Sequence, residues 1–129
     1  MSDRADNIIV ARGIWGTVVC AVCSNYSAPS KEFLDNLRKD KNSSSDFIKM
    51  MALFSRMAST GKIFNRTKFK QVENKIYEFK HGQIRIGCFQ VRNNWILTHG
   101  FIKKQDRWPK SELDRAERIM NEYLARGQE

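Results

Sequence analysis

The chain has 129 residues, a length typical of one domain that can bury a modest core without disulfides or metal ions. Hydrophobic residues make up 41% of the chain and both signs of charge are present, which excludes an intrinsically disordered protein. The net charge of +9 favours a polyanionic partner. With no long apolar run and no signal-peptide pattern, we expect a cytoplasmic protein without membrane contact.

The first forty residues predict one strand and one helix. Residues 1–12 form either a flexible tail or, from Ile8 to Val10, the start of an extra strand. Gly13 to Val22 is a nearly continuous apolar run, which is typical of a strand packed on both faces. Pro29 opens a helix that runs to about Asp40 and buries an apolar side.

A second helix is predicted from Ser43 to Gly61, because Ser43 and Asp46 have capping-box spacing and glycine commonly ends helices. One of its faces carries Phe47, Met50, Met51, Phe54, Met57 and Ala58. A stripe of methionine and phenylalanine can line a promiscuous binding groove, but its helical spacing favours a face packed in the core.

The three cysteines, Cys20, Cys23 and Cys88, are an odd number, which argues against a disulfide framework. Cys20 and Cys23 have CxxC spacing, yet residues three apart on a strand point to opposite faces. No second CxxC, carboxylate cluster, phosphate-binding glycine loop or nucleophile motif accompanies them. We therefore predict buried thiols, no metal site and no cofactor.

Residues 62–74 are basic and irregular, so we expect a loop. Arg66, Lys68 and Lys70 surround Phe69 in this segment. Such a mixture suits contacts with an RNA backbone and one aromatic ring for a base. Phe69 is equally suited to anchoring the loop in the core.

Three strands follow at 76–80, 84–91 and 95–102, because these runs are rich in β-branched and aromatic residues and are separated by His-Gly and Asn-Asn. Connections this short join antiparallel neighbours. The expected order is one strand, two helices, three strands and a final helix. This order predicts a single α+β domain with an antiparallel-rich sheet of about four strands and helices packed on one side.

The last helix begins near Pro109 and Ser111, where Ser111 and Asp114 again have capping-box spacing. Apolar residues then recur on one face as Leu113, Ala116, Met120, Tyr123 and Leu124. This face must cover something apolar, and the three-stranded meander is the obvious surface.

The positive charge is concentrated in one part of the sequence. Between Gly61 and Lys110 there are twelve Lys or Arg and three acids, a difference of +9, whereas the remaining residues hold eleven of each sign and cancel. A localised basic surface is typical of a protein that binds a polyanion such as RNA. The alternatives are a solvated basic face or an acidic protein partner.

The stretches GQIRIGCFQV, WILTHGFIKKQDRWPKSELDRA and RIMNEYL resemble the phage-derived Gp49-like branch of the RelE/HigB toxin superfamily. The likeness is close over the last part of the chain and extends to the first part only as element order. It implies a RelE-like fold and the toxin of a type II toxin–antitoxin pair. Such toxins are endoribonucleases that cut mRNA, commonly in the ribosomal A site. A cognate antitoxin neutralises them, and operator DNA is bound only through the antitoxin complex.

The same resemblance implies roles for cations of the meander. Arg85 matches the family's arginine on the central strand and is assigned to the scissile phosphate. Lys103 and Lys104 match the basic pair that ends the last strand, and alternation places only one of them on the concave face. Lys80 lies where relatives carry cations. Glu78 shares a face with Lys80, and antiparallel pairing allows it to approach Arg85.

Cutting RNA without a metal requires a group that takes the 2′-hydroxyl proton, a group that protonates the leaving oxygen, and cations for the added negative charge. The candidates for proton transfer are His81, His99, Glu78 and a lysine with a lowered pKa. His81 is otherwise an ordinary turn residue, and His99 a buried structural one. Relatives place a tyrosine or histidine near the C-terminus, but Tyr123 lies on the apolar helix face, so the base stays open.

Further contacts with RNA are expected from Arg92, Arg107 and Trp108, the last of which either stacks on a base or packs beside Pro109. The main alternative function is a non-catalytic RNA- or ribosome-binding module of the same fold. A DNA-binding regulator is disfavoured, because no predicted helix is strongly basic.

Overall fold

The computed structural model of the protein describes residues 8–126, so most of the expected N-terminal tail lies outside the described residues. The described residues form six strands and three helices. In chain order these are β1 (Ile8–Arg12), β2 (Thr17–Cys20), α1 (Pro29–Lys39), α2 (Ser44–Thr60), β3 (Phe69–Glu73), β4 (Ile76–His81), β5 (Ile84–Val91), β6 (Asn94–Ile102) and α3 (Lys110–Arg126). The α+β class is confirmed.

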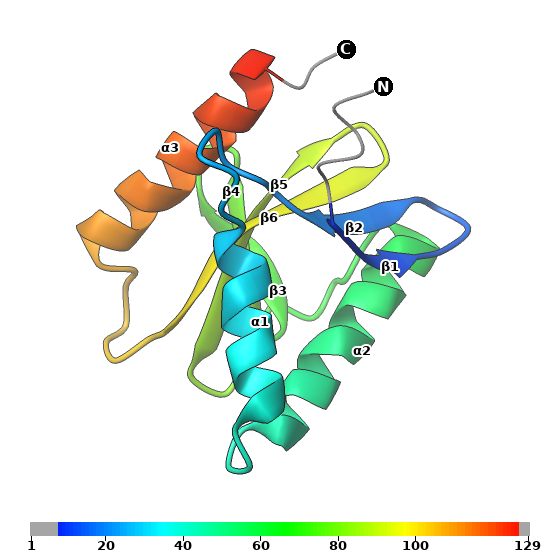
Figure 1. Cartoon of the computed structure of the whole chain (residues 1–129). Coiled ribbons are helices and arrows are strands. Elements are labelled where there is room, and N and C mark those ends of the chain that lie inside the picture. Colours follow the sequence, from blue (N-terminus) through cyan, green and yellow to red (C-terminus); the bar gives the residue numbers. More distant parts are fainter. Residues whose placement is uncertain (1–7, 127–129) are drawn as a thin grey trace.

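All six strands belong to one sheet in the order β1-β2-β6-β5-β4-β3 (Figure 1). The predicted meander β4-β5-β6 is antiparallel, whereas β2 joins β6 in parallel. The prediction of about four strands was wrong, because β1 and β3 add one strand at each edge. β1 confirms the alternative of an extra strand that begins at Ile8. β3 was expected to be part of a loop, because its five residues are mostly polar and Phe69 alone is buried.

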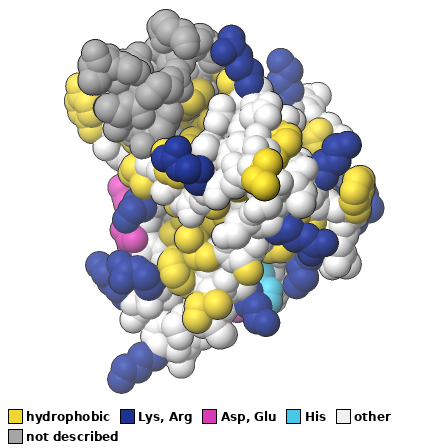
Figure 2. Space-filling model, turned by 90° about the vertical axis from the view of Figure 1, so that its right-hand side faces the viewer, with side chains coloured by type: hydrophobic (Ala, Val, Ile, Leu, Met, Phe, Trp, Pro, Cys, Tyr) yellow, Lys and Arg dark blue, Asp and Glu magenta, His cyan; other side chains and the backbone are white. Residues whose placement is uncertain are grey.

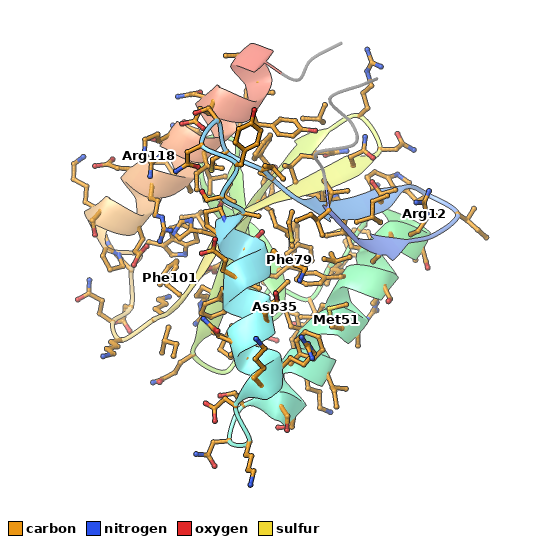
Figure 3. All side chains as sticks on the ribbon, in the orientation of Figure 1. Arg12, Asp35, Met51, Phe79, Phe101 and Arg118 are labelled. Atoms are coloured by element: carbon orange, nitrogen blue, oxygen red, sulfur yellow. The ribbon has the colours of Figure 1, made fainter. Side chains whose placement is uncertain are left out.

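The helices cover both faces of the sheet, which corrects the expectation of helices on one side. The larger core cluster joins α1 and α2 to one face, with Phe54 of α2 packed edge-on against Phe79 of β4 at 4.9 Å between ring centroids. Figure 3 shows Phe79 between these two helices. The smaller cluster joins Ile119 and Tyr123 of α3 to the other face.

The helix ends agree only in part with the predicted signals. Gly61 ends α2 in the left-handed region at φ 78° and donates its N–H to the Met57 carbonyl, as a glycine C-cap does. Both predicted capping boxes were wrong. Ser43 makes no capping hydrogen bond through its side chain, and Ser111 lies inside α3, which begins at Lys110.

Candidate active site

The site is built by side-chain alternation on β4 and β5. Phe79 and Ile86 point towards α1 and α2, and their neighbours Glu78 and Arg85 therefore point to the face that carries α3. Lys80 and Arg85 are direct cross-strand partners. The antiparallel register thus brings one carboxylate and two cations together on the α3 side of the sheet.

Glu78 is the centre of this cluster, with a side chain that is only 1% exposed. Its Oε1 accepts a hydrogen bond of 2.7 Å from Trp108 Nε1 and lies 3.5 Å from Arg85 Nε. Its Oε2 lies 4.0 Å from both Lys70 Nζ and Lys80 Nζ. A buried carboxylate is costly without such partners, so the three cations compensate its charge.

Two buried polar atoms in this cluster have no hydrogen-bond partner among the described residues, namely Glu78 Oε2 and Arg85 Nε. Arg85 is held in place from its other end, where Nη1 donates to the carbonyls of Gly82 at 2.6 Å and Ile84 at 3.0 Å. Buried polar atoms without a hydrogen bond are uncommon, and these two lie within an ion-paired cluster beside other cations.

Lys80 has a pKa below its usual value because the site partly buries its ammonium group. The charges of Lys70, Arg85 and Lys103 lower the pKa further, while Glu78 opposes the shift. A lysine with a lowered pKa gives up its proton more easily, so Lys80 is suited to act as an acid.

A cavity of about 560 Å³ opens beside this cluster, between β3, the segment 103–109 and the first turns of α3. Glu78 forms part of its wall, together with Lys70, Gln71, Val72, Glu73, Lys103, Asp106, Arg107, Trp108, Lys110, Leu113, Asp114 and Glu117. Trp108 is positioned here by packing, since its ring stands edge-on to Phe101 and would clash with a side chain at Gly87. Figure 3 shows Phe101 beside the chain that leads into α3.

The family profile of the phage-derived protein Gp49-like (DUF891) matches residues 32–121. The chain belongs to this family. The Gp49-like family is part of the RelE/HigB-like toxin group and is associated with toxin–antitoxin systems. No curated protein matches the chain. The match begins in α1 and therefore covers α2, the strands β3 to β6 and most of α3.

The Gp49-like match includes every residue of the Glu78 cluster and the whole cavity wall. No described helix is long and apolar enough to span a membrane. Positive charge alone does not locate the site, because on the face shown in Figure 2 Lys and Arg side chains are spread among exposed hydrophobic ones. The cavity and the buried carboxylate define the candidate site instead.

Several predicted RNA contacts lie apart from the cavity. Lys104 is exposed, and it is Lys103 whose side chain lines the cavity, as alternation required of one of the two. Arg66 is exposed ahead of β3, and Arg92 sits in the turn before β6, at the opposite end of that strand from Lys103. Lys68 contacts β4 through its carbonyl, which accepts the Lys80 N–H at 2.8 Å.

Phe69 is the anchor of β3 and is not a surface ring. It is 8% exposed and packs against Tyr77, Phe79 and Trp95, with ring centroids 4.9 to 5.6 Å apart. Of the two predicted uses of Phe69, the structure supports the one in the core. A ring packed in this way is not available to stack on a base.

Neither histidine touches the cavity. His81 points towards α2, where its Nε2 lies 3.3 Å from Asp46 Oδ1. His99 is fully buried, and its Nε2 lies 2.9 Å from Glu112 Oε1. Tyr123 packs on Phe89 at the far end of α3. Among the predicted groups for proton transfer, Glu78 and Lys80 are therefore the two that meet.

His99 predicts a pH dependence of stability. Burial lowers its pKa from the ordinary value of 6.5, helped by the charges of Arg115 and Arg118 and opposed by the hydrogen bond to Glu112 and by the charge of that carboxylate. His99 therefore binds a proton more readily in the unfolded chain than in the folded protein. The free energy of unfolding is highest above about pH 6.5, and it decreases as the pH falls towards the lower pKa that His99 has in the folded state. Melting temperatures measured from pH 8 to pH 5 should show this decline.

His99→Gln provides the comparison, because glutamine cannot take up that proton. The variant is expected to lose less stability than the wild type over the same pH range. Equal declines in both proteins would contradict the assignment of the effect to His99.

The prediction of buried thiols is confirmed. Cys20, Cys23 and Cys88 are all buried and free. Burial raises the pKa of Cys20 to about 11 and that of Cys88 well above its usual value. Thiols with such pKa values are unreactive, since the thiolate is the reactive form.

Sequence reasoning missed the part that α3 plays in the site. Trp108 was expected to stack on a base or to pack beside Pro109, not to donate to Glu78. Of the α3 residues in the cavity wall, Leu113 was assigned to the core face and Asp114 to a helix cap. A signal was present: Lys110, Leu113, Asp114 and Glu117 are spaced as neighbours on one helix face.

Proposed function

We propose that the protein is the toxin of a type II toxin–antitoxin pair and acts as a metal-independent endoribonuclease on mRNA in the ribosomal A site. The observation that carries this proposal is Glu78 Oε2, which has no hydrogen bond among the described residues and lies among Lys70, Lys80 and Arg85 beside the cavity that Glu78 lines. A cognate antitoxin neutralises the toxin in this proposal, and operator DNA is bound only through their complex.

In the proposed mechanism, each of four side chains acts in one step of RNA cleavage. Glu78 Oε2 takes the proton of the 2′-hydroxyl, and the ribose oxygen forms a bond to its neighbouring phosphorus. The bond from phosphorus to the 5′ oxygen breaks, and Lys80 supplies the proton for that leaving oxygen. Arg85 and Lys103 stabilise the added negative charge. The products are a 2′,3′-cyclic phosphate and a 5′-hydroxyl.

The second candidate is a non-catalytic RNA- or ribosome-binding module. The observation that favours it is the 1% exposure of Glu78, whose Oε1 already accepts a hydrogen bond from Trp108. A carboxylate in this position balances the cations of a binding surface without meeting a hydroxyl group.

The test uses mRNA on translating ribosomes, and free RNA in the presence of a chelator. We expect cleavage that leaves the two product ends named above, and loss of cleavage when the nucleotide before the cut carries a 2′-deoxyribose. Tight RNA binding without cleavage would favour the binding module. Cleavage of the deoxy substrate would contradict attack by the 2′-hydroxyl.

A further inference from the structure

We infer that the groove between β3 and α3 is a base-binding subsite that selects guanine in the RNA strand held at Glu78. The inference deepens the proposed function and rests on it. Four features of the described residues carry it: the course of the groove, its charges, its apolar walls and the Glu78 oxygen that has no hydrogen bond.

The groove lies between β3 and α3, because residues of both elements line the main cavity. The main cavity pairs Lys70 to Glu73 of β3 with the first turns of α3. A second cavity of about 350 Å³ is lined by Asn74 and Lys75, which follow β3, and by Met120 and Leu124 from later turns of α3. The turn that follows β3 therefore faces later turns of α3 than β3 itself does.

The charges along the groove change sign. Lys70, Lys103, Arg107 and Lys110 lie at the end where α3 begins, and Asp106 and Glu78 are the acids of the lining there. Glu73, Asp114 and Glu117 lie one to two helical turns further along, about 10 Å away at most. A ligand of one sign does not fit such a groove, whereas a nucleotide carries an anionic phosphate at one end and hydrogen-bond donors on its base at the other.

The walls between these ends are apolar. Val72, Trp108 and Leu113 line the groove, and each is only partly buried. Flat apolar surfaces of this kind suit the face of a base in single-stranded RNA, whose Watson–Crick edge stays free for hydrogen bonds.

Glu78 supplies an independent sign of a ligand in the same groove. Its side chain is 99% buried and lines the cavity, yet Oε2 has no hydrogen-bond partner among the described residues. A ribose hydroxyl there would donate a hydrogen bond to this oxygen. The nucleotide's phosphate would then lie near Arg85. In this orientation the base of the nucleotide extends along the groove towards the acids.

Guanine is the base that a carboxylate recognises best. A carboxylate offers two acceptor oxygens side by side, and guanine alone presents two adjacent donors, N1–H and N2–H, on its Watson–Crick edge. Adenine and cytosine place an acceptor beside their donor, and uracil has a single donor between two carbonyls. These bases leave one carboxylate oxygen unpaired or facing another acceptor.

Glu117 is the carboxylate assigned to this contact. Asp114 is engaged by Lys110, whose Nζ lies 3.1 Å from Asp114 Oδ2. Glu117 is half-buried in the groove wall, and within residues 8–126 no ion pair engages it. Glu117 is therefore free to receive the base edge.

The test measures binding of 3′-GMP, 3′-AMP, 3′-CMP and 3′-UMP to the full-length protein by calorimetry. The wild type should bind 3′-GMP about tenfold or more tightly than the others, the discrimination expected of one bidentate contact. Glu117→Gln should lose this preference, because its amide offers one acceptor only. The control Glu32→Gln, an exposed residue of α1 on the other face, should keep it.

Equal affinity of the wild type for the four nucleotides would overturn the inference, and so would an unchanged guanine preference in folded Glu117→Gln. A melting curve confirms that the variant is folded. RNA cleavage is measured separately on the same proteins. Cleavage without guanine preference refutes the subsite and leaves the nuclease standing, whereas guanine preference without cleavage refutes the nuclease and leaves the subsite standing.

Discussion

Replacing Glu78 by glutamine is expected to lower the rate of RNA cleavage by about 10² to 10⁴, the range that a positioned general base contributes. Glutamine has nearly the same shape and keeps an oxygen that can accept the 2.7 Å hydrogen bond from Trp108. It cannot take a proton from a ribose hydroxyl. The variant should therefore stay folded and still bind RNA.

The measurement is single-turnover cleavage of mRNA on translating ribosomes, with RNA binding followed in parallel. Glu32→Gln is the matched control, because it makes the same chemical change on an exposed part of α1. Cleavage by folded Glu78→Gln at the wild-type rate would remove Glu78 from the mechanism. Loss of RNA binding together with cleavage would instead show that the carboxylate organises the cations around it.

Much of this site follows from alternation. The period of two in β4 and β5 puts Glu78 and Lys80 on one face, and the short turn after β4 brings Arg85 opposite Lys80. The same rule separates His81 from them, although the sequence alone left His81 among the candidates for proton transfer. Its partner Asp46 lies on α2, far away in the sequence, and no local pattern connects the two.

The apolar run from Gly13 to Val22 already predicts helices on both faces of the sheet. Gly13 to Val22 was interpreted as a strand buried on both faces, and Val18 and Val19 indeed belong to different core clusters. A strand covered on both faces needs helices on both sides. The doubly buried strand was therefore inconsistent with the prediction of helices on one side, and the structure has helices on both sides.

The bulge between β5 and β6 sets the directions of the Thr98 and His99 side chains, which the local sequence pattern does not predict. The register shifts between Ile86 and Cys88, so that Thr98 and His99 both lie opposite Gly87. A strict period of two would have placed these neighbours on opposite faces, yet Thr98 approaches Gly87 while His99 reaches Glu112 on α3. Bulges of this kind re-aim side chains and depend on the paired strand.

Replacing Arg85 by alanine is expected to lower cleavage by about 10² to 10³, the effect of removing one group that stabilises charge in a transition state. The guanidinium is fixed by the carbonyls of Gly82 and Ile84, which leaves Nε turned towards Glu78 without a hydrogen bond of its own. Arg85→Lys should recover only part of the rate, because an ammonium group cannot hold the carbonyls and a phosphate in the same planar arrangement.

Cleavage on translating ribosomes by the wild type, Arg85→Ala and Arg85→Lys measures this effect. Melting curves are needed as well, since the alanine variant takes from buried Glu78 the cation at 3.5 Å and leaves Lys70 and Lys80 at 4.0 Å. Arg38→Ala serves as the control, because this arginine of α1 is 55% exposed and lies on the opposite side of the sheet. Equal cutting by the wild type and folded Arg85→Ala would refute the phosphate site, and the assignment of Glu78 as the base would lose the group that positions its substrate.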